Sequence, residues 1–349
     1  MLLEAALACA SIIVGAIVYS TMVYSTCWSH IKYYYIGTVY HFHDIFNIRR
    51  NKIDLPSKPG KVAIVTGGSR GIGAEVVKKL LQCDMEVIIA CRTTSAGEKL
   101  ILKIRESGVA SGLAKVYKLD NSSLESVRKF AEQIKTDYDR IHILINNAAI
   151  MFPLAYNKTE DGYEEQWVVN YLSHFLLTSL LLPLLKSGGR PGECSRIVNV
   201  TSCAQDISTI NFEDLENGSK ETSYTYASYG QSKLAQTIFT ITLQRLLQEK
   251  SLNVLVYAVH PGIVITDIFK DTLIGNNKWL MAAWKTPDRG ATPIIYAAVS
   301  EDIERKGGLY ISNCKEIATP SLALKEEVQE RLFDLSLKQV HLKDFFQYL

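Results

Sequence analysis

Short runs of β-branched and other apolar residues alternate along this chain with longer segments in which apolar residues recur every three or four positions. Runs such as Val87–Ala90 and Ile143–Ile145 are almost continuously apolar, as strands covered on both faces must be. This alternation is typical of right-handed βαβ units. We therefore predict an α/β fold with one doubly wound parallel sheet of about seven strands and helices on both faces. The predicted strands are Val62–Thr66, Glu86–Cys91, Ala114–Leu119, His142–Asn146, Arg196–Thr201, Asn253–Val259 and Gly308–Ile311.

The first 55 residues follow a different pattern. Ala5–Tyr24 is a run of 20 residues without a charge, which as a helix would span about 30 Å, the thickness of a bilayer core. Trp28 and Tyr33–Tyr35 follow it like an interfacial aromatic belt. We predict an N-terminal transmembrane helix, with a cleaved signal peptide or a soluble helix as the alternatives. Leu172–Leu185 is also strongly apolar but too short to span, and is predicted to be a buried helix.

The charges that flank the apolar run predict its orientation. Four basic residues follow it and none precedes it, which favours a cytosolic position for the rest of the chain; a luminal or secreted domain is the alternative. Glycosylation sequons would matter only in the luminal case, and the one at Asn199 falls inside a predicted buried strand. We expect residues 1–55 to form the membrane anchor and linker, and residues 56–349 to form one α/β domain. The basic residues are Lys32, Arg49, Arg50 and Lys52, and the sequons are at Asn121, Asn157, Asn199 and Asn217.

Charge and cysteine content exclude several classes of partner. The formal net charge is +2, so no basic field predicts nucleic-acid binding. Seven cysteines, an odd number without a C-x-x-C pair, argue against a disulfide scaffold or a zinc site. His174 and His260 have no second ligand at metal spacing, so we predict no metal site and a structural role for both histidines.

A glycine-rich turn lies between the first predicted strand and a helix that starts near Ile72. Gly67, Gly71 and Gly73 would allow a tight turn and a close approach of a dinucleotide pyrophosphate to free N–H groups at the helix N-terminus. Together with the strand order this predicts a Rossmann-like domain; a glycine loop without a ligand is the alternative.

The end of the second strand bears on which dinucleotide is bound. An NAD-binding site would usually carry an acidic residue here to accept from the ribose 2′-hydroxyl, and Ala90–Thr94 contains none. Arg92, with Arg70 in the glycine turn, would instead pair with a 2′-phosphate. We expect NADP(H) to be preferred and NAD(H) to be the alternative; the arginines could also be ordinary solvated surface.

Four side chains that could take part in catalysis follow the glycine turn along the chain. Asn170 lies in a helical segment, Ser202 closes a predicted strand, and Tyr229 precedes Lys233 by one helical turn, so that both side chains face the same way. With the glycine turn, this order resembles the short-chain dehydrogenase/reductase superfamily from about Lys61 to about Ser312. The resemblance implies an oxidoreductase in which Tyr229 is the general acid/base, Ser202 holds the substrate oxygen, and Asn170 kinks its helix and binds a water near Lys233.

An unperturbed phenol has a pKa of about 10, so Tyr229 needs help to act as a base near neutral pH. We expect the Lys233 ammonium and the oxidised nicotinamide to lower the pKa of Tyr229. The resemblance also places Asp120 near the adenine, Asn147 near the ribose, and the Ile263 or Val264 backbone with Thr266 at the carboxamide. Ala149 replaces a glycine of the family motif. The implied cofactor-binding residues are Gly67, Ser69, Arg70, Gly71, Ile72, Gly73, Arg92, Asp120, Asn147, Tyr229, Lys233, Val264 and Thr266.

After the Pro261–Gly262 turn, the apolar residues of Ile268–Ile274 and Trp279–Trp284 lie in the region that usually covers the substrate in the family, and they are expected to cover a lipophilic alcohol or carbonyl. The chain is similar to the retinol dehydrogenase branch and more closely to the X-chromosome dehydrogenase/reductase type, which implies polyprenol chemistry. An endoplasmic reticulum or lipid-droplet membrane is the expected location, with either a homodimer or a monomer. Steroid or xenobiotic carbonyl reduction is an alternative activity. A catalytically inactive dinucleotide-binding scaffold is the alternative class, although all four catalytic positions are filled.

Overall fold

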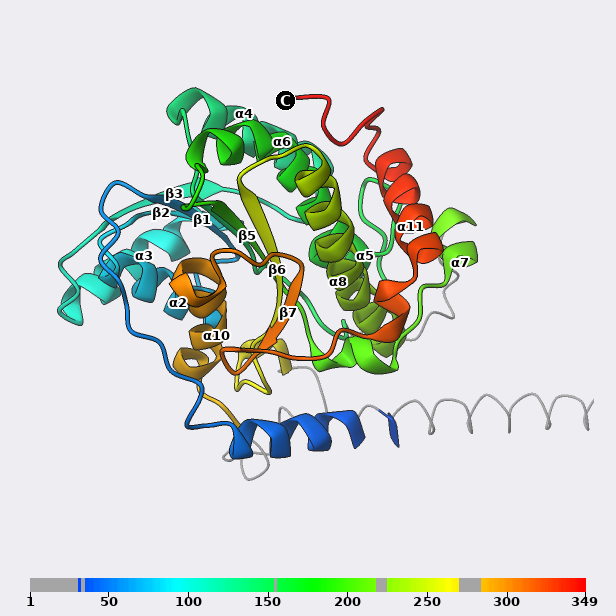
Figure 1. Ribbon diagram of the computed structural model, residues 1–349, viewed down its shortest axis with the longest axis horizontal. Helices are drawn as coiled ribbons and strands as arrows, with labels where there is room; N and C mark the ends of the chain where they lie inside the picture. The colour runs from blue at the N-terminus through cyan, green and yellow to red at the C-terminus, as the bar shows by residue number, and fades with distance from the viewer. Residues whose placement is uncertain (1–30, 33–34, 154–155, 218–224, 270–283) are drawn as a thin grey trace, which may run out of the picture.

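One twisted sheet forms the centre of the protein in the computed structural model, which describes residues 31–32, 35–153, 156–217, 225–269 and 284–349 (Figure 1). The sheet has eight strands in the order β3-β2-β1-β4-β5-β6-β7-β8. All neighbouring pairs are parallel except β7 with β8. The strands are β1 (Val62–Thr66), β2 (Glu86–Cys91), β3 (Leu113–Lys118), β4 (Ile143–Asn146), β5 (Ser195–Val200), β6 (Val254–His260), β7 (Leu309–Ser312) and β8 (Lys315–Glu316).

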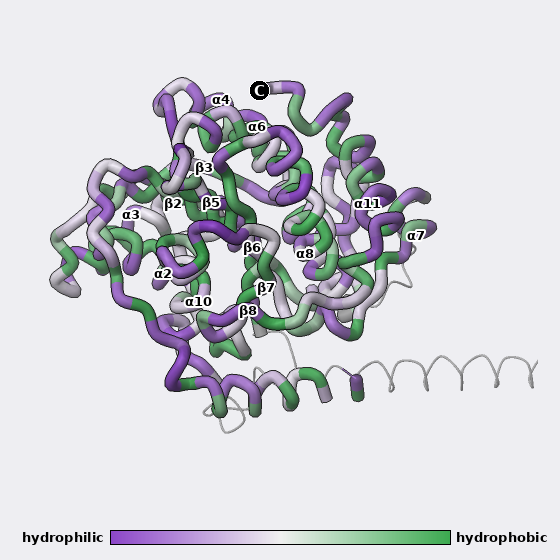
Figure 2. Tube along the Cα trace, in the orientation of Figure 1, coloured by the Kyte–Doolittle hydropathy of each residue, from purple (hydrophilic) through white to green (hydrophobic). Residues whose placement is uncertain are grey.

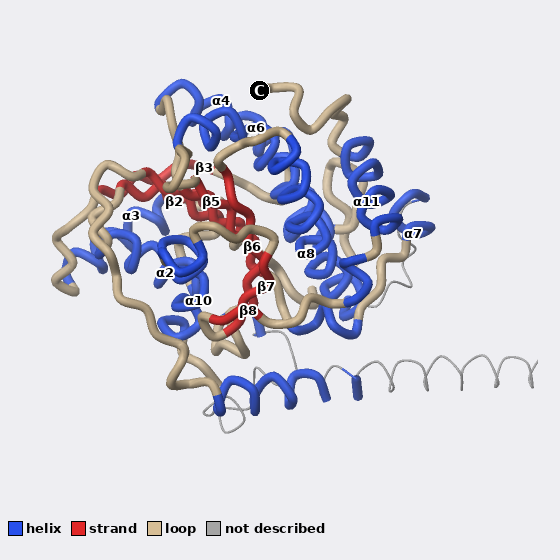
Figure 3. The backbone as a smooth tube through the Cα atoms, viewed as in Figure 1, coloured by secondary structure: helices blue, strands red, loops and turns tan. Residues whose placement is uncertain are grey.

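Helices cover both faces of the sheet, as Figure 3 shows. Helices α2 (Gly71–Gln82), α3 (Thr94–Glu106) and α10 (Pro287–Val299) share one apolar core with one face of the strands. Helices α4 (Leu124–Asp137), α6 (Ser173–Gly188) and α8 (Thr225–Glu249) share the other core, with α11 (Glu326–Gln339) packed on α8. Shorter elements are α5 (Glu165–Trp167), the π-helix η1 (Val168–Leu172), α7 (Phe212–Asn217), and the 3₁₀ helices η2 (Cys203–Ile207), η3 (Asp267–Phe269), η4 (Glu301–Ile303) and η5 (Ser321–Leu324).

The predicted parallel sheet with helices on both faces is confirmed. Residues of β1, β4, β5 and β6 are buried along their whole length, and Figure 2 shows the hydrophobic strands between the helices. The prediction of about seven strands was one short. The eighth, β8, consists of two exposed charged residues that pair antiparallel to β7, so no apolar pattern marks it. Asn199 lies fully buried in β5 and donates to Thr240, as expected of a sequon inside a strand.

Glu165–Gly188, comprising α5, η1 and α6, is the helix in the described part of the chain that is long and apolar enough to cross a membrane. Its most apolar stretch is 94% buried inside the domain, so the prediction of a buried core helix here is confirmed. The predicted span Ala5–Tyr24 lies outside the described residues.

A helix over residues 35–46 lies against the domain at the edge of the sheet where the parallel strands end (Figure 1). Tyr40 donates a hydrogen bond to Asp206, beyond β5, and Asp44 forms an ion pair with Lys285, which bridges to the turn after β6. Part of the segment predicted as a linker is therefore helical and packs on the α/β domain.

Candidate active site

The glycine-rich turn leaves β1 where the strand order reverses direction, between β1 and β4. A crevice at this point is where doubly wound sheets bind ligands. Gly67 and Gly71 have φ of 63° and 57°, in the left-handed region that favours glycine. The residue before α2, Arg70, makes no side-chain cap, and the first turn of α2 contains no acidic residue. The first N–H groups of α2 therefore remain available for an anion such as a pyrophosphate.

The packing at two glycines of the turn leaves no room for a larger residue. A Cβ on Gly73 would collide with the Gly67 carbonyl, and a Cβ on Gly67 would lie 2.9 Å from Ala148 Cα. A Cβ on Gly71 would lie 3.6 Å from Thr266 Cγ2, so the loop after β6 faces the turn after β1. The structure thus brings the predicted residues Gly67, Gly71 and Thr266 together, and their shape fits a dinucleotide.

Thr66 organises the floor of this crevice, a role that no pattern in the sequence indicates. Its side chain is fully buried, and Oγ1 accepts from the backbone N–H groups of Asn147 at 2.9 Å and Ala148 at 3.0 Å. Thr66 Oγ1 also lies 2.9 Å from His174 Nε2. Asn147 donates its side-chain amide to the Thr66 carbonyl at 2.9 Å, which ties the end of β4 to the end of β1.

His174 and His260 are both buried, and burial lowers the pKa of each to about 3. His174 contacts Thr66 and the Asn170 carbonyl, consistent with its predicted structural role. His260 packs edge-on against the ring of Tyr40, with ring centroids 4.9 Å apart.

The end of β2 lies beside the glycine turn, because Gly67 N donates to Ala90 O at 2.8 Å. Arg70 and Arg92 are exposed there, and the first turn of α3 contains no acidic residue. Asp120, beyond β3, accepts from Ser122 N and Oγ at 3.0 and 2.7 Å. Cofactor contacts by Arg70, Arg92 and Asp120 stay predictions.

Asn170 lies in the π-helical turn η1, where the helix widens between α5 and α6. Its side chain is fully buried and clamps the backbone of Ile150, accepting from N at 2.9 Å and donating to O at 3.0 Å. The Asn170 amide also donates to Ser232 Oγ at 3.0 Å. This side chain therefore joins the segment after β4 to the helix that carries Tyr229 and Lys233.

Lys233 is buried on α8, where its ammonium donates to Val200 O at 2.7 Å and to Gln236 Oε1 at 3.1 Å. Burial lowers its pKa to about 7. Lys233 Nζ lies 5.9 Å from the centroid of the Tyr229 ring. An ammonium has three N–H donors, so two contacts leave one to serve a ligand. Gln236 was not among the predicted site residues, although its i+3 spacing places it on the same helix face as Lys233.

Tyr229 is 7% exposed and lies near Ser202, which caps η2 beyond β5. Burial raises the pKa of Tyr229 above its ordinary value, and the nearby Ser202 hydroxyl opposes that rise. The expectation of a lowered pKa therefore does not hold for the protein alone, because desolvation of the phenolate dominates. Phe152 packs edge-on against Tyr229 at 5.4 Å between centroids, an apolar neighbour that no sequence pattern indicated.

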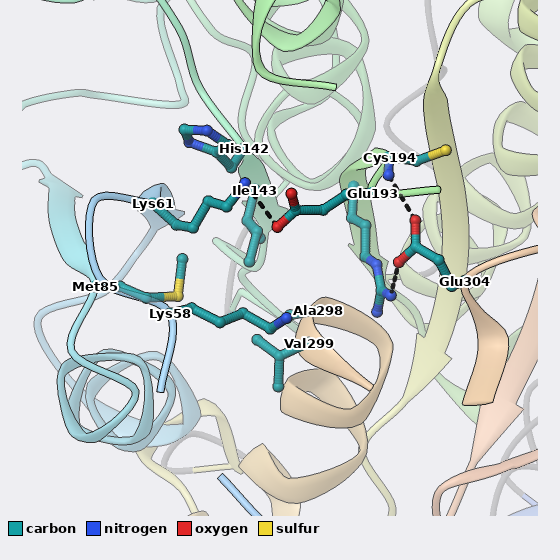
Figure 4. Close-up of a pocket in the computed structure, with 11 residues that line it drawn as sticks. Lys58, Lys61, Met85, His142, Ile143, Glu193, Cys194, Ala298, Val299 and Glu304 are labelled. Carbon is teal, nitrogen blue, oxygen red and sulfur yellow. Dashed lines mark hydrogen bonds and ion pairs between the residues drawn. The ribbon is translucent and has the colours of Figure 1, made fainter. Parts of the chain in front are cut away.

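The hollow in Figure 4 is a separate feature. It is lined by Lys61, His142 and Arg196 at the amino ends of β1, β4 and β5, the opposite edge of the sheet from Tyr229. Lys61 pairs with Glu193 at 2.8 Å, and Arg196 pairs with Glu304 at 2.5 Å. These ion pairs link the segments that meet at the amino ends of the strands. The predicted substrate cover lies largely in residues 270–283, outside the described part.

Known proteins resemble the chain in both sequence and structure. The sequence profile of the family described as "short chain dehydrogenase" matches residues 61–276. Human polyprenol dehydrogenase is 38% identical over 83% of this chain and 88% of its own length. Mouse retinol dehydrogenase 12 is 39% identical over 80% of this chain and 85% of its own.

Two solved structures extend the likeness to the fold. An uncharacterized protein from Mycobacterium Paratuberculosis is 30% identical, with a TM-score of 0.66 over 83% of this chain and 96% of the other. The Pseudomonas aeruginosa RhlG/NADP active-site complex is 26% identical, with a TM-score of 0.57 over 73% and 95%.

Proposed function

The chain belongs to the short-chain dehydrogenase family and is an oxidoreductase related to polyprenol and retinol dehydrogenases; from this premise we propose that it interconverts a lipophilic alcohol and its carbonyl with NADP(H). The observation that carries the proposal is the convergence of Ser202, Tyr229 and Lys233 beside the glycine-lined crevice at the carboxyl ends of the strands. When bound, the nicotinamide ring would accept or supply the hydride of this reaction.

Tyr229 is the general acid/base of the proposed mechanism. In oxidation its phenolate takes the proton from the substrate hydroxyl group as the hydride leaves the carbon that bears this hydroxyl. In reduction its phenol gives a proton to the carbonyl oxygen as the hydride adds to the carbonyl carbon. Ser202 lies near Tyr229, so one substrate oxygen could contact both hydroxyl groups. Phe152 and the burial of Tyr229 would keep water away from the reacting oxygen.

Lys233 tunes this proton transfer. With a pKa lowered to about 7 by burial, it changes charge near neutral pH, and bound phosphates and ribose hydroxyls would favour its ammonium form. The ammonium would then offset the desolvation that raises the pKa of Tyr229. Asn170, which holds the Ile150 backbone and Ser232, keeps the Tyr229–Lys233 face of α8 aligned with the end of β4 and would hold the water that connects Lys233 to solvent.

NADP(H) is the proposed cofactor, with NAD(H) as the alternative. Arg70 and Arg92 are both exposed beside the glycine turn, and no acidic residue stands in the first turn of α3 to accept from a 2′-hydroxyl. A 2′-phosphate placed between the two guanidinium groups would find two charge-assisted partners.

The substrate is proposed to be a polyprenol-like or retinol-like lipid. The segment Ala5–Tyr24 would anchor the protein in the membrane that holds this lipid. The basic residues after this segment support a cytosolic domain on the endoplasmic reticulum or a lipid droplet. Relatives named for polyprenol and retinol support the lipid class. Steroid or xenobiotic carbonyl reduction would use the same residues and is the second candidate.

The test is a cofactor-coupled assay of the purified full-length chain in lipid-containing detergent micelles. Polyprenol, retinol and a steroid alcohol are each offered with NADP⁺ and with NAD⁺. We expect turnover of an isoprenoid alcohol with NADP⁺. Turnover of the steroid alone would favour the second candidate, and cofactor binding without turnover of any substrate would favour an inactive scaffold.

A further inference from the structure

The helix over residues 35–46 is fixed to the domain by a buried charge pair. Asp44 is 5% exposed, and its Oδ1 lies 2.9 Å from Lys285 Nζ and accepts from Asn313 Nδ2 at 2.9 Å. Its Oδ2 accepts from Ile263 N at 3.0 Å. Burial disfavours the ionised carboxyl, but the Lys285 charge, the nearby His260 and the hydrogen bonds from Lys285 and Asn313 together outweigh it and hold the pKa of Asp44 below its usual value. A carboxylate from the N-terminal segment thus contacts the backbone of the turn after β6 directly.

Lys285 connects the same pair to the rest of that turn. It is 7% exposed, and Nζ also donates to Pro261 O at 3.3 Å and to Asn313 Oδ1 at 2.7 Å. Its backbone N donates to Ile263 O at 2.9 Å. Gly262 has φ of 94°, and a Cβ there would collide with Lys285 Nζ and the Asp44 carboxylate. The turn therefore wraps around the ion pair and takes its shape from it.

The next residues of the turn lead into the crevice. Val264 is 4% exposed and bridges to Lys285 through the backbone. Thr266 then faces Gly71 of the glycine turn. Asp44 and Lys285 therefore lie outside the crevice but fix the backbone that forms one of its walls.

We propose that Asp44 is a positioning residue for cofactor binding, which acts through Lys285 and Ile263 on the turn that carries Val264 and Thr266. This rests on the proposed function in one respect, that the turn takes the nicotinamide end of the cofactor. The anchor-side segment is thereby part of the active-site architecture, and losing Asp44 loosens the cofactor without removing any group that touches it.

The test measures the dissociation constant of NADPH by fluorescence titration, with the melting temperature beside it, on the full-length chain in detergent. Asp44→Asn and Lys285→Met each leave one buried charge without its partner, so each should weaken NADPH binding about tenfold or more. The double variant Asp44→Asn/Lys285→Met leaves no unpaired charge and should recover most of that affinity. Asp54→Asn, on an exposed carboxylate of the same segment, is the matched control and should leave affinity unchanged.

A purely structural role would lower the melting temperature and leave NADPH affinity as it is, which would overturn the proposal. If the single variants do not fold, Asp44→Glu keeps the charge but moves the carboxylate by one methylene, and the same loss of affinity is expected. Because the titration needs no turnover, its outcomes separate two failures. A wild-type chain that binds no NADPH refutes the proposed function, whereas binding that ignores Asp44 refutes only this inference.

The outer face of the same helix carries a second and independent observation. Its exposed apolar side chains form one stripe at spacings of three and four residues, with Phe46 81% and Phe42 53% exposed. Basic residues flank the helix on both sides. The stripe consists of Tyr35, Val39, Phe42, Ile45 and Phe46, and the flanking cations are Lys32, Arg49, Arg50 and Lys52.

We infer that this stripe lies on a lipid bilayer, parallel to its surface. A bilayer matches the combination of apolar stripe and flanking cations, and the uncharged run Ala5–Tyr24 ends just ahead of the helix. Since Tyr40 and Asp44 dock the opposite face beside the crevice, the carboxyl edge of the sheet would face the membrane, where a lipid substrate resides.

Photo-crosslinking in vesicles of phosphatidylcholine and phosphatidylserine tests this surface. A benzophenone amino acid replaces Phe42 in the full-length chain, and the matched control places it at Leu102, a 63% exposed leucine on α3. We expect lipid adducts at position 42 and few at position 102. Equal lipid labelling at both positions, or a crosslink from position 42 to a second copy of the chain, would overturn the inference.

Discussion

The Thr66 hydroxyl group offers a sharp test of how the crevice is built. Thr66→Val keeps the size and β-branching of the side chain but removes the oxygen that accepts from Asn147 N and Ala148 N and contacts His174 Nε2. The Asn147 N–H keeps the Ile145 carbonyl as an acceptor at 3.1 Å, so the Ala148 N–H and His174 Nε2 are the groups that lose a partner. Each polar group left unpaired costs about 1–3 kcal/mol, so the two together predict a loss of unfolding free energy of about 2 kcal/mol or more.

Urea unfolding of the full-length chain in detergent, followed by circular dichroism, measures this loss. Thr242→Val is the matched control, because Thr242 is equally buried but its hydroxyl donates only to the Ile238 carbonyl of its own helix. We expect the control to lose less than about 1 kcal/mol, since that carbonyl keeps its backbone hydrogen bond. Thr66→Ser, which keeps the hydroxyl, should retain most of the stability. If Thr66→Val and Thr242→Val lose the same amount, the hydroxyl does not organise the crevice and the reasoning is refuted.

Three further predictions concern the cofactor and pH. Arg92→Asp should shift the ratio of kcat/KM for NADPH over NADH toward NADH by about 30-fold or more, the loss of a charged contact worth ~2 kcal/mol, and an unchanged ratio would make Arg92 ordinary surface. Gly73→Ala should abolish NADPH binding in a fluorescence titration, because its Cβ meets the Gly67 carbonyl; wild-type affinity would show that the turn adapts. Buried His174 and His260, with pKa values lowered to about 3, stay neutral while the unfolded chain takes up protons below pH 6.5, so stability is complete above that pH and falls below it. At pH 5.5 each should cost about 1.4 kcal/mol of unfolding free energy in a urea titration, in addition to the contribution of His142, whose pKa burial lowers to about 4. His260→Phe should therefore remove about 1.4 kcal/mol of the total loss, and a pH dependence unchanged by His260→Phe would contradict the assignment.

Most of the sheet could be predicted because its central parallel strands are buried on both faces and so must be apolar along their length. The edge strand β3 is exposed or partly buried throughout, and its Val116 and Tyr117 favour a strand by their residue type. The strand β8 could not be predicted, since its two residues, Lys315 and Glu316, are exposed and carry no apolar pattern. The glycine turn could be predicted because Gly67 and Gly71 occupy backbone conformations that few other residues adopt, so the residue type itself marks the turn.

The parts of the site that escaped prediction depend on partners far away in the sequence. Nothing in the sequence distinguishes Asp44 from the other carboxylates. Its role depends on contacts with Lys285 and with Asn313, which lies 269 positions further along the chain. Thr66 looks like the ordinary end of a strand, and only folding brings Asn147 to its hydroxyl. The rise in the pKa of Tyr229 likewise follows from its burial, which no local spacing reveals.

The most direct test of the proposed chemistry is Tyr229→Phe in the purified full-length chain, with NADPH affinity and turnover measured on the same preparation. The change deletes one oxygen, the proton-transfer group, and leaves the ring against Phe152. We predict an unchanged dissociation constant for NADPH, an unchanged melting temperature, and a fall in turnover of an isoprenoid alcohol by about 10²–10⁴-fold. Turnover at the wild-type rate, with NADPH still bound, would contradict the assignment of Tyr229 as the general acid/base.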